Sequence, residues 1–259
     1  MFCQQAKPRA GVAEIPSDGE ELSVTTDTPN DRLGLIMERI VLTERNIEEV
    51  AARAATVLRV GGVVLYPTDT LYGLGADALS DEAVAKIFSI KGRNEGKPVH
   101  AIVSDVAMAE MYGEISDTAR GLADKLPRGQ VTFVVPKKQT MNSGISKEIP
   151  TFGFRIPENA FCLQMLSAFG GPITATSANR AGMEPQRSVE AILEQLNSYA
   201  SVLQKTAIGN IDLIIDAGEL PPRKPSSVVG VAGDHVTLLR EGAVSLGQIE
   251  VVAGQAKGV

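Results

Sequence analysis

Short apolar runs alternate irregularly with segments of helical periodicity through most of this chain, and this pattern limits the folds open to it. The run Val63–Tyr66 indicates a buried strand, and His100–Val103 indicates another. Between them a helix is expected, with Ser80 or Asp81 as its N-cap and Gly92 at its end. Because the later strands cluster near the C-terminal end, the pattern predicts a mixed α/β or α+β sheet rather than a parallel barrel.

The same pattern predicts one domain over residues 40–247, with a twisted mixed sheet flanked by helices. Residues 1–35 are rich in Pro, Ser, Thr, Asp and Glu, which is typical of a disordered tail. Residues 248–259 are expected to form a short C-terminal tail, too short for another domain.

Composition excludes several classes of protein. The formal net charge of −6 over 259 residues argues against broad, nonspecific nucleic-acid binding, and 4% aromatic residues leave few platforms for base stacking. Cys3 and Cys162 have no metal-ligand spacing, so we expect no zinc site, no disulfide framework and a cytoplasmic location. His100 and His235 each lie in or beside a predicted strand, away from any Cys or Glu cluster, so neither is expected to ligate a metal.

A group of cations stands at the end of the second predicted helix. Lys91, Arg93 and Lys97 surround two glycines in "KGRNEGKP", which suggests a phosphate ligand. The stretch is not a Walker A loop, because it is one residue short and has Pro98 where a Ser or Thr should stand. Lys91 alone is explained by the helix dipole, whereas Arg93, beyond the helix end, is not.

Three further motifs offer hydroxyl and amide groups. In "YPTDTLYGLG" a strand is broken by proline and followed by Thr68 and Thr70. In "TATSANRAG" a strand ends at Thr176 and a turn carries Ser177 and Asn179, a placement typical of ligand contacts but also of ordinary turns. A fourth candidate, "KPSSVVGV" with the later "LLREG", carries Ser226, Ser227 and Arg240.

The order of these motifs resembles the YrdC-like family of threonylcarbamoyl-AMP synthases, over roughly residues 45–245. The resemblance implies a single domain around a large, concave, positively charged cavity, in a short form without the extra C-terminal domain of longer members. It implies a nucleotidyltransferase that condenses ATP, L-threonine and bicarbonate into threonylcarbamoyl-AMP and pyrophosphate. A second enzyme then transfers the group to adenosine 37 of tRNA. The implied partners are these small molecules and, beyond them, tRNA or the transferase complex, with no membrane.

The resemblance also implies roles for individual residues. The implied catalytic residues are Lys91, Arg93, Ser177 and Asn179. Mg²⁺ would be held mainly by the ATP phosphates, with Ser177 as a candidate protein ligand and no other residue assigned to it. These four residues would also bind ATP, together with Lys97, Thr132 and Arg240. The residues implied for threonine are Thr68, Thr70, Arg155 and Ser226.

Several positions depart from the family pattern, so alternative functions stay open. Asn94, Lys97 and Ile102 replace the usual Pro, Asn and His, and "PRGQVT" replaces the usual Pro-Gly-Pro-Leu-Thr. Most of these positions surround the amino-acid side of the pocket, so a synthase for another amino acid is one alternative. The other is a non-catalytic protein that binds nucleotides or RNA, including double-stranded RNA. A carbamoyltransferase of the hydrogenase-maturation type is disfavoured, because this chain lacks the Cys-x-x-Cys zinc fingers of those proteins.

Overall fold

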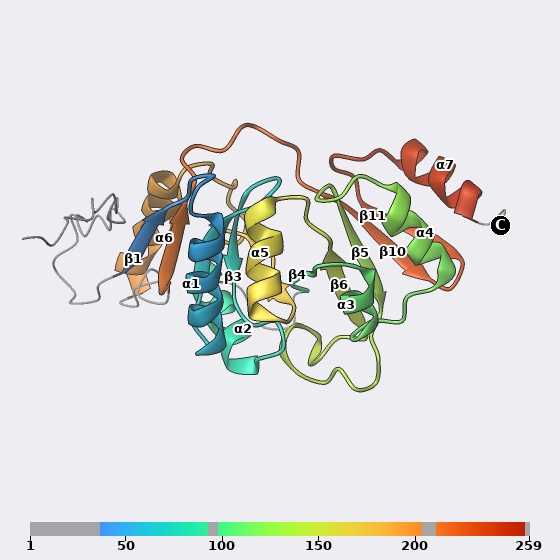
Figure 1. The fold of residues 1–259 in the computed structure, drawn as a ribbon, viewed down its shortest axis with the longest axis horizontal. Coiled ribbons are helices and arrows are strands. Elements are labelled where there is room, and N and C mark those ends of the chain that lie inside the picture. The colour runs from blue at the N-terminus through green and yellow to red at the C-terminus, as the bar shows by residue number, and fades with distance from the viewer. Residues whose placement is uncertain (1–36, 93–97, 204–210, 257–259) are drawn as a thin grey trace, which may run out of the picture.

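The fold is known from a computed structural model that describes residues 37–92, 98–203 and 211–256. Within these ranges the chain forms a five-stranded and a six-stranded sheet, both mixed and both flanked by helices (Figure 1). The predicted fold class, a mixed sheet architecture flanked by helices, is therefore confirmed. No helix of the described residues is long and apolar enough to cross a membrane. Outside the described residues lie the expected N-terminal tail, Arg93, Asn94 and Lys97.

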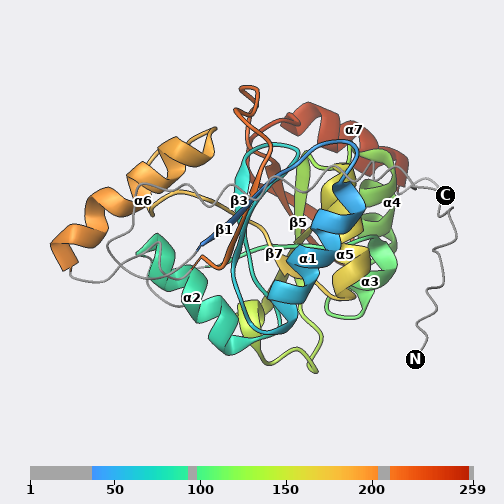
Figure 2. The same cartoon turned by 60° about the vertical axis from the view of Figure 1, so that its left-hand side comes forward.

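The five-stranded sheet has helices on both faces. β1, β9 and β2 run parallel, and β3 is antiparallel to both β2 and β8. Helices α1 and α5 pack on one face and α2 and α6 on the other; in Figure 2 the first pair lies to the right of strands β1 and β3 and the second pair to the left. In the order of the sheet the strands are β1 (Glu38–Val41), β9 (Leu213–Asp216), β2 (Val64–Pro67), β3 (Tyr72–Gly75) and β8 (Thr176–Ser177). The helices are α1 (Ile47–Arg59), α2 (Asp81–Lys91), α5 (Ala160–Phe169) and α6 (Val189–Leu203).

The six-stranded sheet is covered by helices on one face. α4 and α7 pack together there, with α3 beside them. Helix α7 runs across the sequence boundary expected at residue 247, so ordered structure continues past it to residue 256. In the order of the sheet the strands are β11 (His235–Arg240), β10 (Ser227–Ala232), β5 (Val131–Pro136), β6 (Thr151–Arg155), β4 (Ala101–Ile102) and β7 (Ile173–Thr174). The remaining helices are α3 (Val106–Glu110), α4 (Asp117–Lys125), α7 (Leu246–Ala256) and the 3₁₀ turn η1 (Gly144–Ser146).

Strand alternation separates an apolar face of this sheet from a polar one. On β6, Phe152 and Phe154 are fully buried in the core beneath the helices. Successive side chains of a strand point to opposite faces, so Gly153 and Arg155 lie on the other side. On the neighbouring β5 the same rule separates Thr132 from its apolar neighbours. The polar face of the six-stranded sheet is where the site is built.

The predicted end signals of helix α2 are confirmed in detail. Ser80 is the N-cap, and its Oγ accepts a hydrogen bond of 3.2 Å from the backbone N–H of Ala83. Gly92 ends the helix in the left-handed region, at φ 56°, which a residue without Cβ adopts without strain. Lys91, the last helical residue, is therefore held at a defined place and direction.

One predicted strand is divided between the two sheets. The sequence indicates a continuous strand up to Thr176, but the structure has β7 in the six-stranded sheet and β8 in the five-stranded sheet. The change of sheet occurs at Ala175, whose N–H donates to the carbonyl oxygen of His100 at 2.7 Å. This crossing joins the sheets directly before the Ser177 turn.

Candidate functional site

A cavity of about 320 Å³ lies where the two sheets meet, and it collects most of the motifs found in the sequence. The turn that joins β2 to β3 forms one wall, and the ends of β6 and β11 contribute Arg155 and Arg240. Ser177 of β8 and His100, just before β4, close the other side. The lining residues are Thr68, Thr70, Leu71, Tyr72, Gly73, Pro98, Val99, His100, Arg155, Ala175, Thr176, Ser177, Pro185, Pro225 and Arg240.

Two guanidinium groups face this cavity. Arg155 is only 6% exposed, and its Nη1 donates to Thr70 Oγ1 at 3.0 Å and to the Gly129 carbonyl at 3.3 Å. Arg240 donates from Nη2 to the Ser226 carbonyl at 2.7 Å. Burial, and then the positive charge of Arg155, lower the pKa of Arg240. Two like charges held in one partly desolvated cavity favour an anionic ligand, which relieves their repulsion.

No carboxylate is found among the described residues that line the cavity. Its other polar groups are mainly hydroxyls. Thr68 Oγ1 donates to the Leu71 carbonyl at 2.7 Å and lies 3.4 Å from Thr70 Oγ1, which orients the turn from which both threonines project. The cavity therefore offers fixed donors and positive charge to a ligand that carries negative charge.

Thr132 and Ser226 support the cavity from behind its wall. Both are buried, and their hydroxyls are 2.9 Å apart in one hydrogen bond. The Ser226 carbonyl is the acceptor for Arg240, so this pair fixes the backbone that orients that guanidinium. The structure thus joins two residues that the family resemblance implied for different substrates.

Lys91 is buried behind the Ser177 turn. It is 3% exposed, and its Nζ donates to the Asn179 carbonyl at 2.8 Å, to Asn179 Oδ1 at 3.2 Å and to the Ser177 carbonyl. The ammonium group has three N–H donors, and each has an acceptor within reach in this turn. In this state Lys91 therefore holds the turn, and direct contact with a phosphate would require some of these bonds to exchange.

Asn179 completes the same turn. Its Oδ1 accepts a hydrogen bond from Ser177 Oγ, and its Nδ2 donates to the carbonyls of Arg180 and Met183. Ser177 lines the cavity, whereas Lys91 and Asn179 do not. The three residues therefore form one hydrogen-bonded unit, and Ser177 is its member that lines the cavity.

The structure brings together most of the residues singled out in the sequence, and it adds others. Thr68, Thr70, Arg155, Ser177 and Arg240 share the cavity wall; Lys91, Asn179, Thr132 and Ser226 stand behind it; Arg93 and Lys97 lie outside the described residues. Sequence reasoning missed Tyr72 and His100 as lining residues. For His100 a signal was present, because it lies two residues before Ile102, where the family pattern has its histidine, and so on the same strand face.

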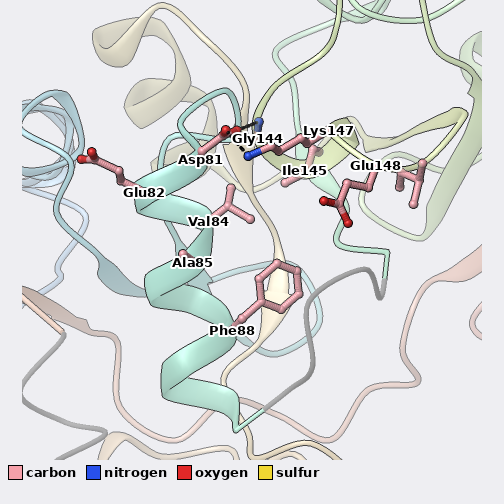
Figure 3. Close-up of a pocket in the computed structure, with 10 residues that line it drawn as sticks. Asp81, Glu82, Val84, Ala85, Phe88, Gly144, Ile145, Lys147 and Glu148 are labelled. Atoms are coloured by element: carbon pink, nitrogen blue, oxygen red, sulfur yellow. Dashed lines mark hydrogen bonds and ion pairs between the residues drawn. The ribbon is translucent and has the colours of Figure 1, made fainter.

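A second cavity, of about 300 Å³, lies between helix α2 and the 3₁₀ turn η1, away from these motifs (Figure 3). Val84 and Phe88 of α2 and Ile145 of the turn give it an apolar wall. At one end Lys147 pairs with Asp81 at 2.8 Å, and both side chains are about half exposed, at 54% and 43%. An apolar hollow with an exposed ion pair lacks the converging buried polar groups of the first cavity.

The fold and the first cavity together define an α/β protein with a cavity between two sheets whose donors and positive charge suit a small anionic ligand. Residues 56–242 match the family model of Sua5, YciO and YrdC, whose description is telomere recombination. The chain belongs to this family.

Named relatives agree with that assignment. The threonylcarbamoyl-AMP synthase of Bos taurus is 34% identical, over 77% of this chain and 75% of its own. The synthase of Pyrococcus abyssi is 32% identical over 85% of this chain, which spans 62% of that protein. The crystal structure of P. abyssi Sua5 complexed with L-threonine superposes with a TM-score of 0.73 at 32% identity, covering 83% of this chain and 61% of that one.

Proposed function

We propose that this protein is an L-threonylcarbamoyladenylate synthase, a nucleotidyltransferase that makes threonylcarbamoyl-AMP and pyrophosphate from ATP, L-threonine and bicarbonate. The observation that carries the proposal is the cavity itself, in which Arg155 and Arg240 converge with the hydroxyls of Thr68, Thr70 and Ser177. Each of the three substrates carries an anionic group, and the described lining residues place no carboxylate against it. Named synthases among the relatives, and the threonine complex of P. abyssi Sua5, support the choice of substrates.

The reaction needs no nucleophile from the protein. The amine of threonine and bicarbonate form N-carboxy-threonine, whose carboxylate attacks the α-phosphate of ATP in line while pyrophosphate leaves. The work of the protein is to hold two anions together and to offset their repulsion, which is catalysis by positioning and by electrostatics. Arg155 and Thr70 are proposed to hold the threonine, and Arg240 and Ser177 to face the nucleotide.

The turn at Ser177 has a supporting part in this mechanism. Lys91 holds the backbone of the turn and Asn179 Oδ1 accepts the Ser177 hydroxyl, so that Ser177 keeps a fixed position at the cavity wall. The ammonium charge of Lys91 adds to the positive potential behind that hydroxyl. If the proposed function holds, Arg93 and Lys97 also bind the triphosphate through their positive charges.

The described residues of this site offer Mg²⁺ an oxygen donor, the Ser177 hydroxyl, but no cluster of carboxylates. Among the described residues no group of three or more His, Cys, Asp or Glu is arranged to hold a metal ion. Oxygen donors suit Mg²⁺, and the Ser177 hydroxyl is such a donor at the cavity wall. We therefore propose that Mg²⁺ enters with ATP, held mainly by its phosphates and by Ser177. When bound it neutralises the charge of the phosphates.

One assay tests the proposal. Purified protein with ATP, L-threonine, bicarbonate and magnesium should release pyrophosphate, and release should stop when either threonine or bicarbonate is left out. ATP binding with no pyrophosphate release under these conditions would contradict a synthase. Replacing threonine by serine or by other amino acids identifies the true amino-acid substrate, which bears on the departures at Lys97 and Ile102.

The wider setting follows from the same proposal. The product would be passed to a transferase that modifies tRNA, and the enzyme would act in the cytoplasm with its tRNA partner. The competing function is a non-catalytic protein that binds nucleotides or RNA, double-stranded RNA included. Filter binding with a duplex RNA distinguishes them, because an overall charge of −6 predicts weak, salt-sensitive retention.

A further inference from the structure

The imidazole of His100 occupies a defined position in the wall of the site cavity. It lies against Gly153 on the polar face of the six-stranded sheet, and a Cβ at that glycine would come within 2.3 Å of the imidazole Cδ2. The backbone of His100 is held as well, since its carbonyl accepts the N–H of Ala175 at 2.7 Å. Gly153 thus makes room for the ring, two residues before Arg155 on the same strand face.

Imidazole is the side-chain group of this wall whose ordinary pKa allows it to take up and release a proton near neutral pH. The other titratable groups among the described lining residues are Tyr72 on β3, Arg155 on β6 and Arg240 on β11. Burial raises the pKa of Tyr72, whose hydroxyl donates to the Gly218 carbonyl at 2.8 Å. Guanidinium groups stay charged at any physiological pH. An imidazole, by contrast, is the side chain whose ordinary titration falls in the neutral range.

The proposed reaction requires a proton acceptor at its first step. Threonine enters as an ammonium ion, which has no lone pair with which to attack carbon. Once one N–H bond is broken, the neutral amine and bicarbonate give the carbamate and water: a C–N bond forms, a C–O bond breaks, and no further proton is released. The first proton must therefore leave the ammonium, and the described wall offers no carboxylate to take it.

We propose that His100 is a catalytic residue, which accepts the proton of the substrate ammonium through an imidazole nitrogen and so prepares the amine for its reaction with bicarbonate. The inference rests on the proposed function and adds a role at the same site. The proton passes from the imidazolium to solvent, because His100 is partly exposed. Arg155 and Arg240 share the wall with His100, so the imidazole lies beside the groups that we propose to bind the two anionic substrates.

The test is the pH dependence of pyrophosphate release with His100→Gln. Glutamine keeps a polar side chain at this place but does not titrate. We expect kcat at neutral pH to fall on the order of 10²-fold, as for loss of a general base, with threonine affinity by calorimetry changed by less than about threefold. The defect should shrink at alkaline pH, where threonine in solution already carries a neutral amine, and added imidazole should restore part of the rate.

Two further variants complete the design. His235→Gln, at an exposed histidine of β11, should leave the rate and the pH profile unchanged. Gly153→Ala keeps the imidazole but displaces it, and should lower kcat while a melting curve shows that the protein is folded.

The inference is overturned if His100→Gln keeps kcat and the pH profile, or if it weakens threonine binding while kcat is unchanged. A wild-type pH profile with no acidic limb would also overturn it, whatever the variants do. A wild-type protein that releases no pyrophosphate is a separate result, because it contradicts the proposed function itself.

Discussion

The site cavity and the cavity between α2 and η1 are nearly equal in volume, at about 320 and 300 Å³, but they differ in character. In the first, buried Arg155 and the more exposed Arg240 converge with hydroxyls from segments far apart in the sequence. In the second, apolar side chains of α2 and η1 line a hollow whose charged groups are all exposed: Asp81 and Lys147 pair with each other, and Glu82 and Glu148 lie nearby (Figure 3). Size does not separate a binding site from a packing gap here, whereas the burial and convergence of polar groups do.

The difference has an electrostatic reason. A charge that is taken out of water costs free energy unless a partner compensates it. Arg155, at 6% exposure, donates to two neutral oxygens, those of Thr70 and Gly129, and an anionic ligand would compensate its charge. Lys147 has a carboxylate at 2.8 Å and open solvent, so nothing further is needed.

The largest loss of activity should come from Lys91→Met, which lies behind the wall of the first cavity. Methionine fills a similar volume but leaves the carbonyls of Ser177 and Asn179 without their donor. Turnover measured by pyrophosphate release should fall on the order of 10²–10³-fold, and unfolding by denaturant should lose about 1–3 kcal/mol. Normal turnover in a folded Lys91→Met protein would refute the role assigned to this turn.

Arg155→Met tests the converging charge itself. The substitution removes a guanidinium that bonds Thr70 and Gly129, and relieves its repulsion of Arg240. We expect kcat/KM for threonine to fall on the order of 10²-fold. The pKa of Arg240 should rise toward its ordinary value. The matched control is Lys147→Met, at the second cavity, which exchanges the same kinds of side chain without loss of activity. Equal losses in both variants would mean that the comparison of cavities is wrong.

Gly144→Ala at the second cavity should affect stability and spare activity. Gly144 has φ +58°, and a Cβ there would lie 2.0 Å from the Ala78 carbonyl oxygen. Backbone strain and the clash together should cost at least about 2 kcal/mol of unfolding free energy. Rate per folded molecule should not change, as measured below the melting temperature with the folded fraction determined by circular dichroism. A loss of kcat in fully folded protein would connect this cavity to the chemistry.

The smallest effect is expected from the ion pair of Asp81 and Lys147. The hydrogen bond from Lys147, and then the Gly144 N–H, lower the pKa of Asp81. A carboxyl whose pKa is lower in the folded state adds stability above its unfolded pKa, and loses it as pH falls through the folded one. The melting temperatures of wild type and Lys147→Met should therefore differ slightly at neutral pH and converge under acid or high salt. A difference that grows on acidification would contradict this assignment.

Local signals in the sequence were reliable where the physics is local. The Ser80 cap and the Gly92 end of helix α2 follow from hydrogen bonds and a backbone angle within a few residues, and both are observed. Family motifs likewise predicted that Thr70, Arg155 and Ser177 belong together, because each motif is a contiguous stretch of chain.

Directions of side chains were harder to predict. The family resemblance implies that Lys91 contacts ATP, which stays a prediction; in the structure its ammonium group is directed to the Ser177 turn. His100 was set aside as a strand residue, and it lines the cavity. The spacing of residues in the sequence predicts neither direction, because each depends on which residue of a distant segment packs against the side chain. Gly153, for example, packs against His100.

The amino-acid sequence was sufficient for the element types, the caps and the family, since these depend on neighbours along the chain or on contiguous motifs. The cavity required the folded molecule. Its wall exists because the chain changes sheets at Ala175, so that β8 and the turn after β2 face the ends of β6 and β11. Sheet pairing between segments separated by tens of residues carries no local signature. Burial also decides which cations favour an anionic ligand: Arg155 is buried without a carboxylate partner, whereas Lys147 is exposed and paired with Asp81.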